Sequence, residues 1–492
     1  MERRVLVCLG CLLIWVLTAC RESETPQPAR PNILFAIADD WSWPHAGAYG
    51  DRVVKTPNFD RVANEGILFN HAFVASPSCT PSRAAILTGQ WHWRLEESAN
   101  LWSTLRSEFP VYPDLLEESG YFVGYTRKGW GPGKFEVGGR TRNPAGTHFD
   151  DFEGFLAEKP EGKPFCFWFG SIDPHRGYEE GSGIAGGIPA ENIELMPAFP
   201  DSPEIRSDVA DYYWEVQRFD QEVGSILDRL RALGELDNTL VVITSDNGMP
   251  FPRCKGNLYD GGVRVPLAMR WPAKISGRRV LDDFVSLTDL APTFLEVAGL
   301  VPPDVMTGRS LATTLFSNQE GRVDETRGSI LFGKERHVPV QEAPDAGGTP
   351  MRGIRTYEYL YIKNFRPDRW PAGTPNYEDA HFPGSWYGDV DNGPTKSYMV
   401  EHQRKDEHHA ELFQLAFEKR PGEELYDLRN DPGQLKNLAG DSAFGQVKSE
   451  LEQRLMQELL ATKDPRALGE ADRLEQYPYY GGSPLKPGFK KD

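Results

Sequence analysis

Two apolar runs, residues 33–38 and 240–244, are each followed by side chains that could bind a metal ion. These side chains are Asp39, Asp40, Asp246 and Asn247. Carboxylate and amide oxygens are the ligands that hard divalent cations prefer. An acidic residue at one such position is more often a helix cap or a turn residue. Two such pairs at one edge of a predicted sheet indicate a cation site.

A third motif, "SCTPSRAAILTG" at residues 78–89, places a cysteine at the expected start of a helix. Pro81 suits the first turn, and Arg83, four residues after Cys79, lies on the same face one turn along. A helix N-terminus favours negative charge, so a thiolate at Cys79 would be activated. A thiolate is a poor ligand for a hard cation, so the site requires an oxygen nucleophile. The plain alternative is a small buried residue at a helix start.

The elements that position these residues alternate between strand and helix. The apolar runs are typical of strands buried on both faces of a parallel sheet, and a third run, residues 165–170, leads to Asp173 and His175. Residues 216–230 show helical spacing ahead of Gly234, and residues 287–298 form another expected helix before Gly299. We expect an α/β fold with helices on both faces and the acidic residues at the carboxyl ends of the strands.

Composition limits the function classes. The chain has 492 residues, 39% hydrophobic and 11% aromatic, enough for a substantial core, and its net charge of −18 argues against nucleic acid as a partner. An anionic substrate would need a local basic pocket. Of the six cysteines, only Cys79, Cys166 and Cys254 lie beyond the first 20 residues, so the chain is not a disulfide scaffold.

The N-terminus predicts export. A basic start and an apolar stretch end in "LTAC", which resembles a bacterial lipoprotein box with Cys20 as the lipidated residue. The alternative is an ordinary secretory signal. We expect a signal peptide over residues 1–20, a flexible tether over 21–30, a catalytic domain over 31–325 and a smaller domain over 326–492 that completes the substrate pocket. The protein would then be anchored to a bacterial membrane by its lipid alone, facing the periplasm or the cell exterior.

The Cys79 segment resembles the signature of type I sulfatases: Cys-x-Pro-Ser-Arg, three residues, then Leu-Thr-Gly. The resemblance extends from Pro31 to about Gly440. It implies that Cys79 is converted to formylglycine by a generating enzyme, and that its hydrate gives one oxygen to calcium and one to attack on sulfur. It also implies an alkaline-phosphatase-like, mainly parallel sheet and a C-terminal α+β domain with an antiparallel sheet and a terminal helix.

The same resemblance assigns roles to individual residues. One calcium ion is bound by Asp39, Asp40, Asp246, Asn247 and residue 79. Arg83 holds the hydrate, and Lys128 binds sulfate. His175 and Lys255 lie near the leaving group. The chain departs from the family at Trp130, where a histidine is expected two places after Lys128, and the hydrogen bond of that histidine must be supplied otherwise.

Basic residues beyond the metal site suggest how a sulfated sugar would be recognised. The candidate substrate-binding residues are Lys334, Arg336, His337 and Arg352. The "PMR" and "PFPRCKGNLY" stretches resemble the heparan N-sulfatase (sulfamidase) branch, which implies N-sulfoglucosamine of a heparin-type chain as substrate. Alternatives are a sulfate-ester hydrolase acting on an algal polysaccharide such as ulvan or fucoidan, a phosphoryl-transfer relative, and a non-catalytic sulfated-carbohydrate-binding protein. Cys79 argues against the phosphoryl-transfer relative, and the complete set of metal ligands argues against the binding protein.

Overall fold

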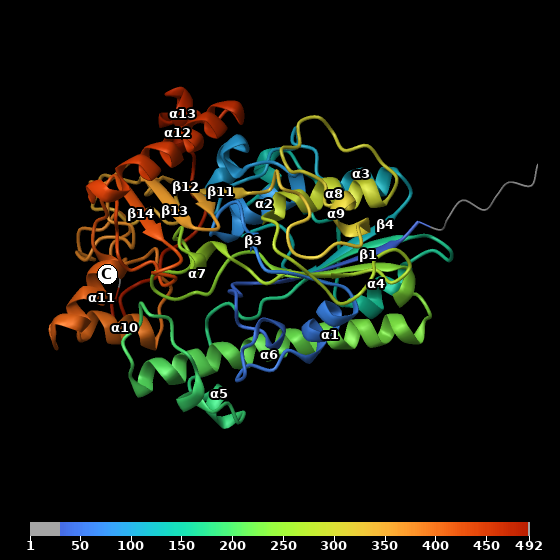
Figure 1. The fold of residues 1–492 in the computed structure, drawn as a ribbon, viewed down its shortest axis with the longest axis horizontal. Coiled ribbons are helices and arrows are strands. Elements are labelled where there is room, and N and C mark those ends of the chain that lie inside the picture. The colour runs from blue at the N-terminus through green and yellow to red at the C-terminus, as the bar shows by residue number, and fades with distance from the viewer. Residues whose placement is uncertain (1–29, 491–492) are drawn as a thin grey trace, which may run out of the picture.

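The computed structural model describes residues 30–490, in two parts that lie side by side (Figure 1). The larger part holds the long central sheet, and the smaller part is formed by the C-terminal third of the chain. Cys20 and the expected signal peptide and tether up to residue 29 lie outside the described residues. Among residues 30–490, no helix has the length and apolar character needed to span a membrane.

The main sheet has eight strands in the order β5-β4-β6-β1-β7-β8-β2-β9. Strands β5, β4, β6, β1 and β7 run parallel to one another, whereas β8 is antiparallel to both of its neighbours, β7 and β2. This confirms the expected mixed, mainly parallel sheet. The strand bounds are β1 Asn32–Ala38, β2 Ile67–Phe69, β4 Phe122–Arg127, β5 Thr147–Phe149, β6 Phe165–Gly170, β7 Thr239–Ser245, β8 Ala268–Arg270 and β9 Arg279–Leu281. A short pair, β3 Ala72–Phe73 and β10 Val285–Ser286, lies beside it.

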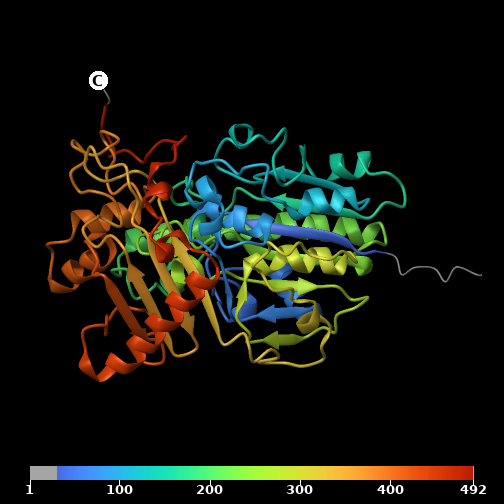
Figure 2. The ribbon, with the colours of Figure 1, turned by 90° about the horizontal axis from the view of Figure 1, so that it is seen from above.

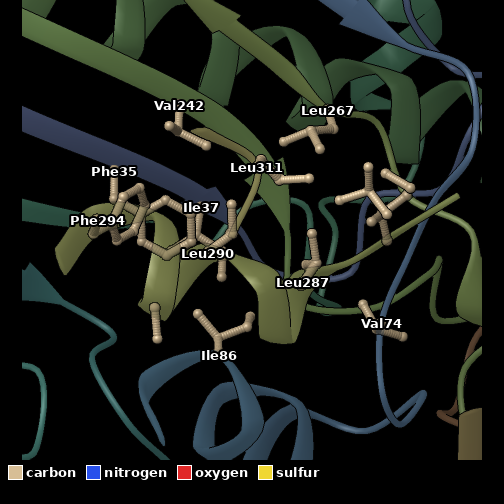
Figure 3. Packing of buried hydrophobic residues seen from close by; sticks show 14 of the residues in the cluster. Phe35, Ile37, Val74, Ile86, Val242, Leu267, Leu287, Leu290, Phe294 and Leu311 are labelled. Atoms are coloured by element: carbon tan, nitrogen blue, oxygen red, sulfur yellow. The ribbon is translucent and has the colours of Figure 1, made fainter. Parts of the chain in front are cut away.

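Helices cover both faces of this sheet, which is why its central strands are apolar at every position. On β1, Phe35 and Ile37 face one core and Leu34 and Ala36 the other. Figure 3 shows the first core, where Ile86 and Phe294 pack toward the sheet. The helices on that side are α2 Cys79–Thr88, α3 Tyr112–Glu118, α8 Leu290–Val297 and α9 Ala312–Phe316. Those on the other are α1 Pro57–Glu65, α4 Phe152–Glu158 and α6 Pro203–Ala232.

Helix α6 has the strongest local determinants. The hydroxyl of Ser202 accepts a hydrogen bond from the backbone N–H of Ile205, and Pro203 occupies the first turn. Its buried stripe includes Val216, Phe219 and Leu230 of the predicted helical pattern. The helix ends just before Gly234, whose φ of +71° is the left-handed conformation that ends helices.

The C-terminal part is a four-stranded antiparallel sheet in the order β11-β12-β13-β14, as expected (Figure 2). The strands are β11 Ser329–Lys334, β12 Met351–Thr356, β13 Tyr359–Asn364 and β14 Glu423–Asp427. One face packs against α12 Gly445–Ala461 through Leu455 and Leu459, and the other joins the core of the main sheet. Helices α10 Pro394–Glu401 and α11 Glu407–Phe417 precede β14.

The chain does not stop at α12, the helix expected to close the domain. It continues through the short helices α13 Pro465–Leu468 and α14 Asp472–Gln476. The segment that follows runs back toward the larger part, where Tyr479 packs on a small apolar cluster that contains Cys79. The predicted domain boundary at 325/326 stays a prediction.

Candidate active site

The carboxyl ends of β1 and β7 bring the two predicted metal-binding pairs together. In this parallel pair Ala38 is opposite Ser245, so the residues that follow each strand lie side by side. Asp40 adopts φ +79°, and its N–H donates to Oδ1 of Asp246 over 3.1 Å. The amide of Asn247 donates to Oδ1 of Asp40 over 2.6 Å and to Oδ1 of Asp246 over 2.8 Å. The four side chains form one buried cluster.

Cys79 lies at the first residue of α2, as the sequence predicts. Its Sγ is 3.7 Å from Oδ1 of Asp39 and 4.0 Å from Oδ1 of Asp40, so the side chain faces the acid cluster. Burial raises the pKa of the Cys79 thiol well above its ordinary value, although Lys128 and Lys255 oppose this. The expected activation of a thiolate by the helix N-terminus is therefore wrong, because burial outweighs it. An unmodified Cys79 is a neutral thiol at neutral pH.

Arg83 connects α2 to both strand ends. Its Nε donates to Oδ2 of Asp246 over 2.6 Å, and its Nη1 donates to the backbone carbonyls of Lys128 and Gly129 over 2.8 and 2.9 Å. Its Nη2 lies 3.6 Å from Oδ1 of Asp39 and has no hydrogen-bond partner of its own. The guanidinium is completely buried. One donor thus remains for a group placed between Cys79 and Asp39.

Two lysines neutralise the first acid pair. Lys128 Nζ donates to both carboxylate oxygens of Asp39 over 2.6 and 2.5 Å, and Lys255 Nζ donates to Oδ2 of Asp40 over 2.7 Å. Burial opposes the charge on every one of these groups, but the cations lower the pKa of Asp39 far below its ordinary value. The carboxylates in turn raise the pKa of both lysines, so the lysines are charged. For Asp40, burial prevails and raises the pKa.

The open side of the cluster carries a histidine and an aspartate. His175 is about one-third exposed, with Nε2 3.9 Å from Oδ2 of Asp40 and Nδ1 2.6 Å from the carbonyl oxygen of Arg176. Asp391, from the loop before α10, places Oδ2 3.4 Å from Nζ of Lys255. Sequence reasoning missed Asp391, because "GDVDNG" reads as a loop and only the fold brings it to the site.

The cluster fits a hard divalent cation. Ligand atoms of Asp39, Asp40, Cys79 and Asp246 all lie within 4.8 Å of one another and are buried. The Oδ1 of Asn247 is buried with no hydrogen-bond partner, while Nδ2 of the same amide points at two carboxylates. Rotating the amide by half a turn would add its oxygen to the carboxylate oxygens, which is the donor set such a cation binds.

Trp130 does not replace the expected histidine. Its ring is buried in the hydrophobic core on the α2 side of the sheet, and its backbone N–H and carbonyl both bond the side chain of Asn143. A histidine does reach the Cys79 segment from another direction: His337 follows β11, and its Nδ1 lies 2.8 Å from Oγ of Ser78, next to Cys79. Burial lowers the pKa of His337 to about 4, so its ring is neutral at neutral pH.

Lys334 and His337, which the sequence predicts to bind substrate, lie beside the loop that carries Lys255. A Cβ built on Gly256, next to Lys255, would lie 3.8 Å from Nζ of Lys334 and 4.0 Å from Cγ of His337. Lys334 is buried and donates to Oδ2 of Asp389 over 2.8 Å. Its charge is thus already compensated within the protein.

The structure places Arg336 and Arg352 in contacts within the protein rather than beside the acid cluster. The Nη2 of Arg336 donates to the backbone carbonyl of Tyr477 over 2.8 Å, which ties down the C-terminal segment. Arg352 is completely buried, and all its donors are used: by Asp464 and Glu335, and by the carbonyls of residues 334 and 351. The sequence predicts that Arg352 binds substrate, but its side chain on β12 points away from the site, toward Asp464 between α12 and α13. No donor is left for a sugar.

An alkaline-phosphatase-like sheet that presents a buried acid cluster fit for a cation, two lysines and a side chain at a helix N-terminus is typical of hydrolases that act on anionic esters. Known proteins agree with this class. The family model described as sulfatase matches residues 31–137 and 141–300. A second one, described as the C-terminal part of N-sulphoglucosamine sulphohydrolase, matches residues 254–370. The chain belongs to the sulfatase family.

Individual relatives cover nearly the whole chain. Human N-sulphoglucosamine sulphohydrolase is 30% identical over 92% of this chain and 94% of its own. An ulvan-active sulfatase of Formosa agariphila is 24% identical over 95% of this chain and 80% of its own. A solved structure of a protein in complex with its substrate D-glucosamine-2-N,6-O-disulfate superposes with a TM-score of 0.59 at 21% identity, covering 88% of this chain and 98% of that one. This last likeness concerns the fold alone.

Proposed function

We propose that this chain is an exported hydrolase that removes sulfate from the N-sulfoglucosamine of a heparin- or heparan-type chain. The proposal includes a formylglycine made from Cys79 by a generating enzyme, one calcium ion, and a lipid on Cys20 that anchors the protein to a bacterial membrane. The observation that carries it is the position of Cys79, which faces Asp39 and Asp40 at the start of α2.

The buried thiol explains why a modification is needed. Since burial keeps Cys79 protonated, the thiol itself is neither a nucleophile nor a ligand for a hard cation. As the hydrate of formylglycine, residue 79 would offer oxygen atoms that could bind the cation and attack sulfur, which the thiol cannot do. Calcium, when bound, supplies a Lewis acid that stabilises negative charge on these oxygens. The Nη2 of Arg83, 3.6 Å from Oδ1 of Asp39 and without a hydrogen-bond partner, is a donor available to the hydrate.

The remaining residues act on the sulfuryl group and the leaving group. Lys128 and Lys255 place two ammonium groups beside the acid pair, where they stabilise charge that develops on the sulfuryl oxygens. His175, the most open of these side chains, donates a proton from Nε2 to the departing nitrogen or oxygen. Water supplies the remaining oxygen, so that sulfamate hydrolysis gives a free amine and sulfate.

Two observations favour the sulfamate substrate. The C-terminal family match at residues 254–370 and the relation to the human N-sulphoglucosamine sulphohydrolase both point to N-sulfated glucosamine. Asp391 adds a physical reason, because a carboxylate near Lys255 at the open side favours a leaving group that becomes a cationic amine.

A second candidate has its own support. The relation to an ulvan-active sulfatase favours a sulfate ester of an algal polysaccharide. Both candidates use the same sulfur chemistry and differ only in the sugar and in the atom that leaves. A non-catalytic binding protein would need neither the buried lysines nor a convertible residue at 79.

A panel of defined sulfated oligosaccharides separates these functions. The proposal predicts release of sulfate from N-sulfoglucosamine at the non-reducing end, with a free amine appearing in equal amount. Release from an ester position without cleavage of the N–S bond would support the algal candidate instead. Binding of the oligosaccharides without release of sulfate would contradict both hydrolase functions.

A further inference from the structure

Lys396 near the start of α10 is an unusual buried cation. Its side chain is completely buried, and its Nζ donates to four oxygen atoms, none of which carries a charge. These acceptors are the carbonyls of Trp386 at 2.7 Å, Tyr387 at 3.1 Å and Val390 at 2.8 Å, and Oδ1 of Asn392 at 2.9 Å. Three N–H groups shared by four neutral oxygens resemble a monovalent cation in a ring of carbonyls.

Keeping the Lys396 ammonium group charged in this buried position costs free energy. Burial lowers the pKa of Lys396 to about 7, against the attraction of Asp391 and Asp389. A methionine of similar length would avoid this cost, but it would leave the carbonyls of the segment without donors. The lysine therefore has a task that an apolar side chain cannot perform.

That task concerns the segment of residues 386–392, which is neither helix nor strand. At Tyr387 the backbone has φ +44°, a left-handed conformation that a residue with a large side chain adopts only when its surroundings enforce it. Lys396 gathers carbonyls from both sides of this point. It thus closes residues 386–392 into a compact turn around its ammonium group.

The turn presents two aspartates to the active site. Asp389 accepts from Nζ of Lys334 and from the backbone N–H of Val338, both over 2.8 Å. Asp391 lies 3.4 Å from Nζ of Lys255, which also donates to Asp40. The path from Lys396 to the acid cluster is therefore short and passes through Asp391 and Lys255.

We propose that Lys396 is a positioning residue for sulfate hydrolysis. Its ammonium group holds residues 386–392 in the conformation that sets Asp391 against Lys255, and so fixes Nζ of Lys255 beside the reacting group. Lys396 itself touches neither substrate nor metal ligand. The inference rests on the sulfatase activity of the site and not on the identity of the sugar.

The experiment uses Lys396→Ala, a small aryl sulfate as substrate and ammonium chloride as a rescue agent. The matched control is Arg279→Ala, since Arg279 is also a buried cation whose donors bind neutral oxygens, and it lies on the edge strand β9 of the main sheet. Its partners are the carbonyls of Thr314, Leu315 and Gln319 and the hydroxyl of Ser317, all at 2.9 Å. Both variants lose comparable packing, and thermal unfolding measures this loss in each.

We expect kcat of Lys396→Ala to fall by about tenfold or more with KM changed by less than about threefold, because positioning affects the bound state. Ammonium ion should refill the ring of carbonyls and restore kcat by about threefold or more, whereas sodium chloride at the same ionic strength should not. Arg279→Ala should keep the wild-type kcat. In an Asp391→Asn background, Lys396→Ala should add almost no further loss.

The inference is overturned if folded Lys396→Ala has the wild-type kcat, if its loss equals that of Arg279→Ala, or if the loss is undiminished in the Asp391→Asn background. If Lys396→Ala does not fold, Asn392→Ala replaces it, removes one acceptor and should lower kcat by about threefold; an unchanged kcat would then overturn the inference. An inactive wild type would instead count against the proposed function.

Discussion

Nε of Arg83 lies 2.6 Å from Oδ2 of Asp246, and both side chains are completely buried. This contact joins helix α2, which begins at Cys79, to the end of β7, two motifs that are far apart in the sequence. It fixes how Cys79 faces the acid cluster. Breaking such a pair leaves an uncompensated charge in the interior, which costs far more than the pair contributes when intact.

Replacing Arg83 by methionine should therefore damage stability and activity together. We expect the free energy of unfolding to fall by about 3 kcal/mol, and turnover of an aryl sulfate to fall by about 100-fold or more. Urea unfolding and steady-state kinetics measure the two effects. The control is Arg61→Met, whose partner Asp228 is exposed and lies 3.5 Å away, so its loss should cost less than about 1 kcal/mol. Equal destabilisation by both variants would contradict the role of the buried pair.

Asp246→Asn should abolish metal binding and turnover without changing side-chain volume. The acid cluster loses one negative charge and one oxygen ligand, and hard cations depend on both. Calcium content after dialysis and activity after chelation and calcium addition provide the measurement. Asp228→Asn, an exposed acid on α6, should retain both metal and activity. The account fails if Asp246→Asn still binds calcium stoichiometrically.

Much of this architecture could be predicted from the sequence, because it depends on local patterns. Continuous apolar runs identified β1, β6 and β7 as central parallel strands, and parallel strands place their ends at one edge. That predicted that Asp39, Asp40, Asp246 and Asn247 lie together, whereas Cys79 was added to them by the resemblance of its segment to the sulfatase signature. The proline and arginine of the nucleophile segment likewise placed the start of α2 correctly.

The residues that could not be predicted depend on the path of the C-terminal chain. Asp391 and Lys396 lie in and after a loop with no regular pattern, so nothing local indicates that Asp391 reaches Lys255 or that Lys396 binds the carbonyls of this loop. Arg352 was assigned to substrate from a short motif, but the direction of a side chain on β12 depends on register and on the helix packed behind it. The raised pKa of the Cys79 thiol follows from burial by distant segments, which outweighs the helix N-terminus.

Acid should destabilise the protein through its buried histidines. Burial lowers the pKa of both His45 and His337 to about 4, whereas an unfolded histidine titrates near about 6.5. Above about pH 6.5 neither state is protonated and stability is complete. As the pH falls toward 4, the unfolded chain binds protons first, so the free energy of unfolding decreases, by about 2 kcal/mol per histidine at pH 5.

His45→Gln tests this sign, because His45 is buried and its Nδ1 contacts the hydroxyl of Tyr212. The difference in unfolding free energy between pH 7 and pH 5 should shrink by about 2 kcal/mol relative to the wild type. Exposed His408→Gln serves as the control. An identical pH difference in His45→Gln and wild type would refute the prediction.

Arg352→Met should act on stability and not on the sugar. Arg352 is buried and bonds Asp464 and Glu335, and its loss leaves the buried carboxylate of Asp464 without its ion-pair partner, while Glu335 keeps Arg466. The loss should cost about 3 kcal/mol. For the folded protein, KM for a sulfated oligosaccharide and for an aryl sulfate should both stay near wild type. A selective rise in KM for the oligosaccharide would restore the substrate-binding role that the sequence suggested.

The central claim is that residue 79 works as a converted nucleophile in a metal-dependent sulfatase site. Mass spectrometry of the peptide that contains residue 79, on protein whose specific activity is measured in the same sample, tests this most directly. We predict that the peptide has lost the cysteine sulfur and carries an aldehyde, and that activity rises in proportion to the converted fraction, while Cys79→Ala is inactive. A fully active sample in which residue 79 is an unmodified thiol would contradict the account.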